Sequence, residues 1–167
     1  MGQFLREFTG GHVSQLASVA RAHLVNLVQH ADLLPGRDAG AFIDIDSLLR
    51  PVYGHAKEGA SYGHTKIAGR QVLRKGLSPL ATTISTGTGA PVIAGIRLRG
   101  GKANSGRGAA SMVREAIVLA RAAGVRGTIL VRGDCAYGNA AVVGACLGAG
   151  ARFSVVLTKN PAVAAAI

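Results

Sequence analysis

The sequence has no tryptophan, and its only aromatic residues besides histidine are three tyrosines and four phenylalanines among 167 residues. Apolar residues still make up 49% of the chain, and glycine occurs 24 times. A scarcity of large aromatics argues against an aromatic-rich β sandwich, whereas many small residues favour closely packed α/β layers. The length fits a domain with a substantial core.

Cysteine is also scarce. Cys135 and Cys146 are the only two, and their spacing is neither that of a disulfide framework nor that of a CxxC motif. We expect both to be packing residues in a reduced compartment. No signal-peptide pattern opens the chain, and no apolar run is long enough to span a bilayer. The sequence therefore predicts a cytoplasmic protein that does not enter a membrane.

Acidic residues number eight against 19 lysines and arginines, which gives a net charge of +11. One explanation is a solvated surface or a GC-rich genome that favours arginine; the other is a polyanionic partner. Ten basic residues but only one acid, Glu58, lie between Arg50 and Arg107. Such clustering favours a nucleic acid, whose phosphates attract a basic surface at long range.

Three of the eight acids follow short apolar runs that have the composition of strands. Residues 41–46 are predicted to form one strand, with Asp44 and Asp46 on the same face as Phe42 and with the isoleucines on the other. Residues 128–132 form another predicted strand, which ends at Asp134. Carboxylate oxygens are the ligands that Mg²⁺ and Mn²⁺ prefer, so two such strands side by side predict a metal site. The alternative is that these acids stabilise turns, where Asp is common.

Apolar periodicity predicts the remaining elements. Residues 1–30 are expected to be helical, with a turn at 8–12 and a helical apolar stripe that starts at residue 13. Further helices are expected at 108–123 and 139–147, and further strands at 80–85, 91–98 and 152–157. This order predicts three antiparallel strands followed by parallel strand-helix-strand additions, a mixed α/β sheet that places the first strand beside the fourth. Asp46 and Asp134 would meet there. We expect a helical segment and linker at 1–38 and the α/β domain at 39–167.

Residues 50–75 are too polar for a core, and we expect a long loop. Basic residues interleaved with tyrosine and histidine suit a surface that contacts a phosphate backbone; a mobile solvated loop is the alternative. The glycine-rich segment 86–90 lacks the Gly-Lys-Ser/Thr of a Walker motif. The candidate DNA-binding residues are Lys57, His64, Lys66, Arg70, Arg74, Lys75, Arg99, Lys102 and Arg107.

Five segments together resemble a known family, in order and spacing. They are FIDID at 42–46, VYGHAKEGA at 52–60, SPLAT at 78–82, RLRGG at 97–101 and VRGDCAY at 131–137. The sequence resembles the DDE transposases of bacterial insertion sequences, in particular the thirteen-eighty group. The resemblance implies an RNase H-like fold, DNA transposition, two Mg²⁺ or Mn²⁺ ions, transposon-end and target DNA as partners, and a possible homo-oligomer in the nucleoid-associated full-length form.

The resemblance places the first catalytic acid at Asp46, with Asp44 as the alternative, and the second at Asp134. Leu48 departs from the threonine usual in the family. The third family acid is a glutamate on a late helix, but no acid follows Asp134, and Glu58 and Glu115 precede it. We therefore expect a fragment, truncated before the last catalytic helix, that binds metal weakly and is inactive alone.

Two other functions are compatible with the sequence. A basic, non-catalytic remnant of an insertion element would bind duplex DNA non-specifically, with an affinity that falls steeply with salt. An α/β domain that binds a small phosphorylated ligand would need a glycine-rich strand-to-helix loop, for which residues 133–139 are a poor match.

Overall fold

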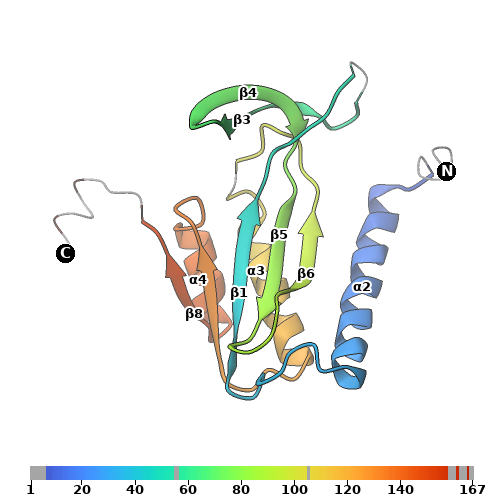
Figure 1. Ribbon diagram of the computed structural model, residues 1–167, viewed down its shortest axis with the longest axis vertical. Coiled ribbons are helices and arrows are strands. Elements are labelled where there is room, and N and C mark those ends of the chain that lie inside the picture. The colour runs from blue at the N-terminus through green and yellow to red at the C-terminus, as the bar shows by residue number, and fades with distance from the viewer. Residues whose placement is uncertain (1–6, 55–56, 105, 158–160, 162–164, 166–167) are drawn as a thin grey trace.

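The computed structural model describes residues 7–157 except 55, 56 and 105, together with 161 and 165, and does not describe the side chains of residues 66 and 67. The described residues form a five-stranded sheet, three helices and a separate three-stranded sheet (Figure 1). The small sheet lies beyond the end of the large sheet at which the central strand β1 finishes.

The large sheet has the strand order β6-β5-β1-β7-β8. Its strands are β1 (Gly40–Ser47), β5 (Leu80–Ser85), β6 (Val92–Arg97), β7 (Thr128–Gly133) and β8 (Arg152–Val155). β1 and β5 pair antiparallel, as do β5 and β6, whereas β1 with β7 and β7 with β8 pair parallel. The mixed sheet predicted from the sequence is confirmed, and it is consistent with an RNase H-like fold.

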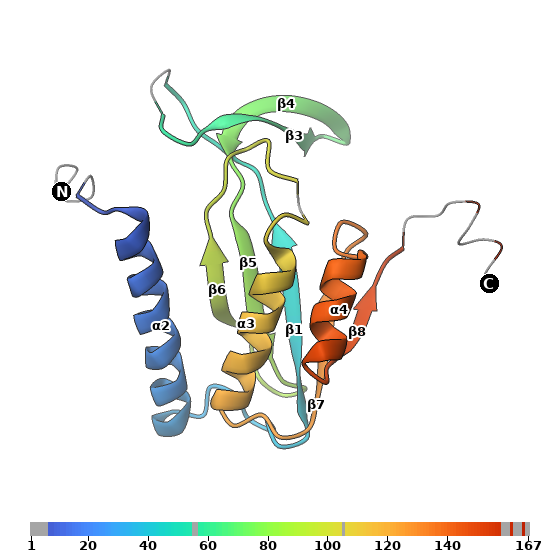
Figure 2. The ribbon, with the colours of Figure 1, turned by 180° about the vertical axis from the view of Figure 1, so that it is seen from behind.

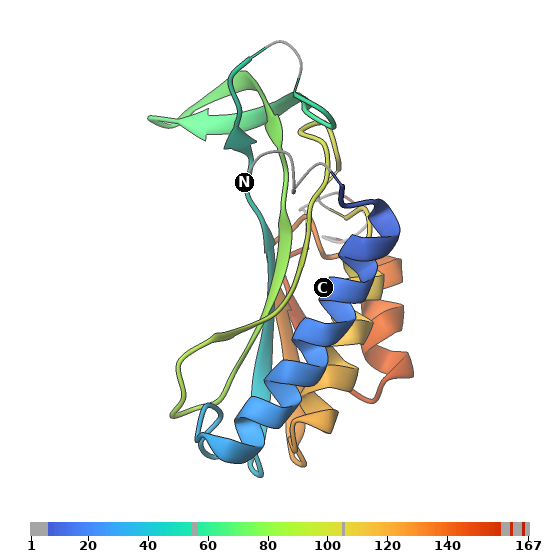
Figure 3. The same ribbon diagram turned by 90° about the vertical axis from the view of Figure 1, so that its right-hand side faces the viewer.

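The three helices all lie on one face of the large sheet (Figures 2 and 3). They are α2 (Gly10–His30), α3 (Ala109–Ala122) and α4 (Ala140–Gly148). Burial alternates along β1, so that Ile43 and Ile45 are buried while Asp44 and Asp46 are on the more exposed face. Packing of the isoleucines into the core therefore determines which face of β1 carries the acids.

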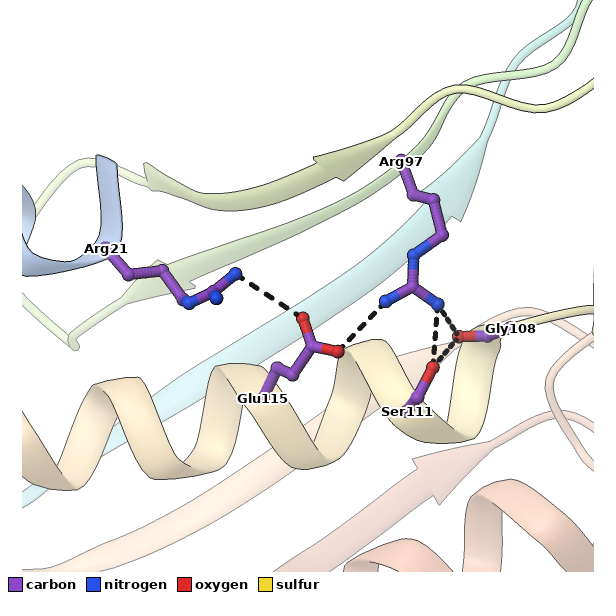
Figure 4. Close-up of polar contacts among 5 residues, drawn as sticks. All are labelled: Arg21, Arg97, Gly108, Ser111 and Glu115. Carbon is purple, nitrogen blue, oxygen red and sulfur yellow. Dashed lines mark hydrogen bonds and ion pairs between the residues drawn. The ribbon is translucent and has the colours of Figure 1, made fainter. Parts of the chain in front are cut away.

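Helix α2 packs only loosely on the rest of the molecule, since Val28 is its only buried residue. Arg21 of α2 forms an ion pair of 3.6 Å with Glu115 of α3 (Figure 4). Glu115 also accepts a hydrogen bond of 2.9 Å from Arg97 of β6, which donates to Ser111 as well. These groups are partly exposed, so each pair contributes only about 0–1 kcal/mol.

The start of α2 lies three residues earlier than predicted. The Thr9 hydroxyl accepts a hydrogen bond from the backbone N–H of His12, and the His12 ring accepts one from the Thr9 N–H. This reciprocal capping stabilises the first turn despite its two glycines. The division of the chain at residue 38 stays a prediction. Within the described residues, no helix is both long and apolar enough to cross a membrane.

The prediction of a long loop at residues 50–75 was wrong. This segment contains β2 (Arg50–Pro51), β3 (Ser61–Ile67) and most of β4 (Arg70–Leu77), which pair antiparallel in the order β2-β4-β3. Ala68 and Gly69 connect β3 to β4, and both have positive φ angles, as in the tight turns that match the twist of a hairpin. Backbone pairing forms this sheet without the apolar alternation that sequence analysis relies on.

Glycines attach the small sheet to the segment after β6. The Gly101 N–H donates a hydrogen bond of 3.0 Å to the Gly76 carbonyl, and the Lys102 N–H donates one of 2.9 Å to the Ser61 hydroxyl. A methyl group on Gly101 would collide with the carbonyl oxygens of Ser61 and Gly76. Leu49 packs against the same glycines. The close approach of two backbones explains why this segment is Gly100-Gly101.

Candidate active site

The two predicted catalytic acids lie at the same edge of the large sheet. β1 and β7 are adjacent and parallel, with Asp44 opposite Arg132, so Asp46 and Asp134 each follow two residues further along their strands. Both line one pocket of about 520 Å³, together with Ser154 and its neighbours from β8. The structure therefore brings together the two carboxylates that the sequence predicted to meet.

Asp44 is paired with an arginine. Arg132 donates two hydrogen bonds of 2.7 Å to the two carboxylate oxygens of Asp44. Its guanidinium also lies 4.4 Å from the centre of the Phe42 ring, a cation–π distance. The hydrogen bonds to Asp44 raise the pKa of Arg132. Both oxygens of Asp44 are thus occupied by a bidentate partner, which makes Asp44 a poorer metal ligand than Asp46.

Asp46 and Asp134 each use one carboxylate oxygen locally. Asp46 accepts a hydrogen bond of 2.6 Å from the Ser47 N–H, and Asp134 accepts one of 2.9 Å from the Ala136 N–H. Within the part of the chain that the structure describes, the other oxygen of each carboxylate has no hydrogen-bond or ion-pair partner. The turn role considered for Asp134 is therefore real, but it leaves an oxygen for a ligand.

Capping of helix α4, a second possible role of Asp134, is performed by another residue. Asn139 accepts a hydrogen bond of 3.1 Å from the Val142 N–H and is the N-cap of α4. Asp134 is not required to start this helix. Its position at the end of β7 is accordingly compatible with a role in the pocket.

Tyr137 is a further residue near the site. Its side chain is almost fully buried, and no described group makes a hydrogen bond of standard geometry with its phenol oxygen. Burial raises the pKa of Tyr137; the Ser47 side chain opposes this increase, while the charges of Asp46 and Asp134 add to it. The sequence signal was the position of a tyrosine three residues after a strand-end acid.

Most of the nine candidate DNA-binding residues are exposed. Six have exposed positions on the small sheet or in the segments beside it: Lys57, His64, Arg70, Arg74, Lys102 and Arg107. Lys75 is partly buried and donates a hydrogen bond of 3.4 Å to the Gly54 carbonyl. The side chain of Lys66 lies outside the described residues.

Arg99 has a structural environment. It donates hydrogen bonds to the carbonyls of Ser78, Asn104 and Arg107 and to the Ser78 hydroxyl. Burial lowers the pKa of Arg99. These contacts fold the segment after β6 around the guanidinium of Arg99. Arg99 therefore stabilises the conformation of this segment.

Comparison with known families agrees with this geometry. The family described as Transposase DDE domain group 1 matches residues 14–167. The chain belongs to this family. The comparison does not resolve the thirteen-eighty group within it. No curated protein and no solved structure matches the chain significantly.

Membership of the family implies DNA transposition, and with it DNA binding; DDE transposases generally use divalent metal ions. Among the described residues, no group of three or more His, Cys, Asp or Glu side chains is placed to hold a metal. Asp46 and Asp134 nevertheless fit Mg²⁺ or Mn²⁺ as a partial set, because such ions are often bound by one or two carboxylates plus waters and substrate phosphates.

Proposed function

We propose that this chain forms a catalytic core of an insertion-sequence transposase of the thirteen-eighty group, with Asp46 and Asp134 as its metal-binding acids. The observation that carries the proposal is the placement of these two carboxylates at the ends of adjacent parallel strands, on one pocket. Asp44 serves instead to hold Arg132 at the side of that pocket.

The residues have separate roles in this proposal. Asp46 and Asp134 each present a carboxylate oxygen to Mg²⁺ or Mn²⁺. Divalent ions held there would supply charge stabilisation for an in-line displacement at phosphorus. Rigid positions at strand ends suit this role because the separation of the carboxylates is set by the sheet rather than by a loop.

A third acid would complete the family's set, and no Asp or Glu follows Asp134 in this sequence. We propose that the two carboxylates alone bind metal weakly and that the chain does not cleave DNA by itself. Its remaining activity would then be that of a basic DNA-binding domain, which is the second candidate function. The net charge of +11 favours it.

DNA would bind across the small sheet. Arg70, Val72 and Arg74 follow one another at intervals of two residues along β4 and therefore share one face of that strand. The small sheet lies at the end of the molecule toward which β1 runs and at which Asp46 is placed (Figure 1). A phosphate backbone held by these arginines would extend toward the acids.

Manganese-dependent nicking of supercoiled plasmid tests the catalytic part. We expect no nicking by the chain or by its Asp46→Ala, Asp134→Ala double variant. Mn²⁺ binding, measured by calorimetry, should be weak in the chain and lost in the double variant. Nicking that disappears in the double variant would show that two acids suffice and would refute the proposed inactivity. Equal Mn²⁺ affinity in both proteins would refute the metal site.

Salt dependence of duplex binding tests the DNA surface. Replacing Arg70 and Arg74 by glutamine should make the slope of log K against log salt less steep by about 2, since each phosphate contact contributes about 0.9. Arg114→Gln is the matched control, because Arg114 is exposed on α3, on the helical face. A slope that changes equally in the control would show that only net charge matters.

A further inference from the structure

Tyr137 has a buried polar group beside the acids that the fold does not satisfy. The side chain is 1% exposed. A methyl group on Gly133 would lie only 3.1 Å from two carbons of the Tyr137 side chain and 3.2 Å from Ile45, so the tyrosine packs closely over the end of β7. Its phenol oxygen is nevertheless the one buried side-chain polar atom, among those described, that makes no hydrogen bond of standard geometry, although the Ser47 side chain lies close enough to influence its pKa.

The backbone holds this side chain next to Asp134. The Tyr137 N–H donates a hydrogen bond of 3.1 Å to the Asp134 carbonyl, and the Ala136 N–H donates to the Asp134 carboxylate. One tight turn thus fixes the acid and the tyrosine together. The charges of Asp46, Asp134 and Arg99 all influence the pKa of the phenol, so it lies near both acids and near Arg99.

A buried hydroxyl without a partner destabilises the protein unless something else pairs with it. A phenol donates one hydrogen bond, and a carboxylate has several acceptor positions. Carboxylates that bind metals are in turn usually held by hydrogen bonds from neighbouring groups, and loss of such a neighbour weakens metal binding. Tyr137 is the described buried donor that is available for this role.

We propose that Tyr137 is a positioning residue of the Asp46–Asp134 metal site, whose phenol donates a hydrogen bond to a carboxylate oxygen of that pair when a divalent ion binds. The inference rests on the proposed function and extends it to a residue outside the acidic set. Tyr137 does not contact the ion in this arrangement. It fixes the orientation of a ligand from a buried position that DNA does not reach.

Mn²⁺ binding measured by calorimetry tests the hydrogen bond. Tyr137→Phe should weaken Mn²⁺ binding about tenfold, the lower end of the effect of losing such a neighbour. Tyr53→Phe is the control, since Tyr53 is 79% exposed, and its affinity should be unchanged. Without metal, Tyr137→Phe should unfold at the same temperature as the unchanged chain or a higher one, because it removes an unpaired buried hydroxyl. If Tyr137 had only a packing role, Tyr137→Phe would lower neither the affinity for Mn²⁺ nor the stabilisation of the fold by Mn²⁺.

Terbium luminescence gives an independent reading of proximity. Tb³⁺ substitutes for hard divalent ions, and its emission is sensitised by a nearby phenol. The chain has no tryptophan and only three tyrosines, so the donor can be identified by substitution. Tyr137→Phe should remove most of the sensitised emission, whereas Tyr53→Phe and Tyr62→Phe should retain it.

The outcomes separate this inference from the proposed function. If Asp46→Asn with Asp134→Asn leaves Mn²⁺ affinity unchanged, the metal site itself is wrong, and the role of Tyr137 with it. If that double variant loses Mn²⁺ while Tyr137→Phe binds it as tightly as the unchanged chain, only the positioning role is overturned. Sensitised emission that survives in Tyr137→Phe would also contradict the placement of the phenol beside the ion.

Discussion

The two sheets of this molecule are stabilised in different ways. In the large sheet, apolar side chains of β1 and β7 such as Ile43, Ile129 and Val131 are completely buried under the helices. In the small sheet, Tyr62 and Leu73 remain 62% and 54% exposed, and the buried positions include Gly63 and Gly76. The large sheet is therefore stabilised by its core, whereas the small one depends on backbone pairing and on close contact between glycines.

This difference matches the distribution of charge. The acids Asp46 and Asp134 are at the ends of core strands, where the hydrophobic packing fixes their positions. The exposed arginines Arg70 and Arg74 are on the small sheet, which has little core of its own. Metal binding needs fixed ligands, while contact with a phosphate backbone tolerates adjustment. In the proposed function, the metal-binding acids are thus on strands of the packed core, and the DNA-contacting arginines are on the sheet with little core.

Side-chain truncation should give the largest contrast between the sheets. Ile43→Ala should lower the free energy of unfolding by about 2–5 kcal/mol, because it leaves a cavity at a fully buried position. Leu73→Ala, at an exposed position in β4, should change it by less than about 0.5 kcal/mol. Urea denaturation of both variants measures the difference. Equal losses would show that the small sheet has a core comparable to that of the large one.

A glycine substitution should reverse the contrast and affect the small sheet selectively. Gly101→Ala places a methyl group against the carbonyl oxygens of Ser61 and Gly76, a steric conflict that costs about 1–3 kcal/mol. Amide hydrogen exchange should become faster in β3 and β4 and stay slow in β1 and β7. Gly87→Ala, at a position with open space around it, is the control. Faster exchange in β1 would mean that the two sheets unfold as one unit.

Sequence patterns predicted the large sheet well for the reason that now explains its stability. Alternation of apolar and polar residues in residues 41–46, and the apolar runs of the other strands, reflect burial against helices. The small sheet has no such alternation: β4 exposes Arg70, Leu73 and Arg74 alike. Its pairing depends on a two-residue turn and on glycines that fit against another backbone, and neither feature produces a periodic signal.

The candidate active site was likewise predictable only in part. Two strand-end acids and the strand order were sufficient to place Asp46 beside Asp134. The sequence left Asp44 as the alternative to Asp46. It could not predict the ion pair that distinguishes Asp44, because Arg132 is 88 residues after Asp44 and opposite it only in the folded sheet. The burial of Tyr137 was likewise invisible, since a tyrosine in a turn is as compatible with solvent as with a core.

Alkaline pH should weaken the large sheet by a smaller amount, in part through the buried thiol of Cys146. Cys146 of α4 is fully buried, and burial raises the pKa of its thiol. Above the usual thiol pKa of about 8.5, the unfolded chain loses this proton while the folded chain keeps it. The unfolded state then binds fewer protons, so stability is complete below that pH and falls as pH rises, by at most about 1.4 kcal/mol per pH unit.

Urea denaturation at pH 7.0 and at about pH 9.5, near one unit above the thiol reference value, measures this effect. Cys146→Ala should lose part of the alkaline destabilisation, whereas Cys135→Ala should keep all of it because Cys135 is exposed. Comparison of pH slopes, rather than of absolute stabilities, removes the contribution of the cavity that the alanine leaves. If the unfolding free energy falls equally with pH in all three proteins, the buried thiol of Cys146 does not cause the alkaline destabilisation. A slope that decreases only in Cys146→Ala would locate the coupling in the same packed layer that positions the acids.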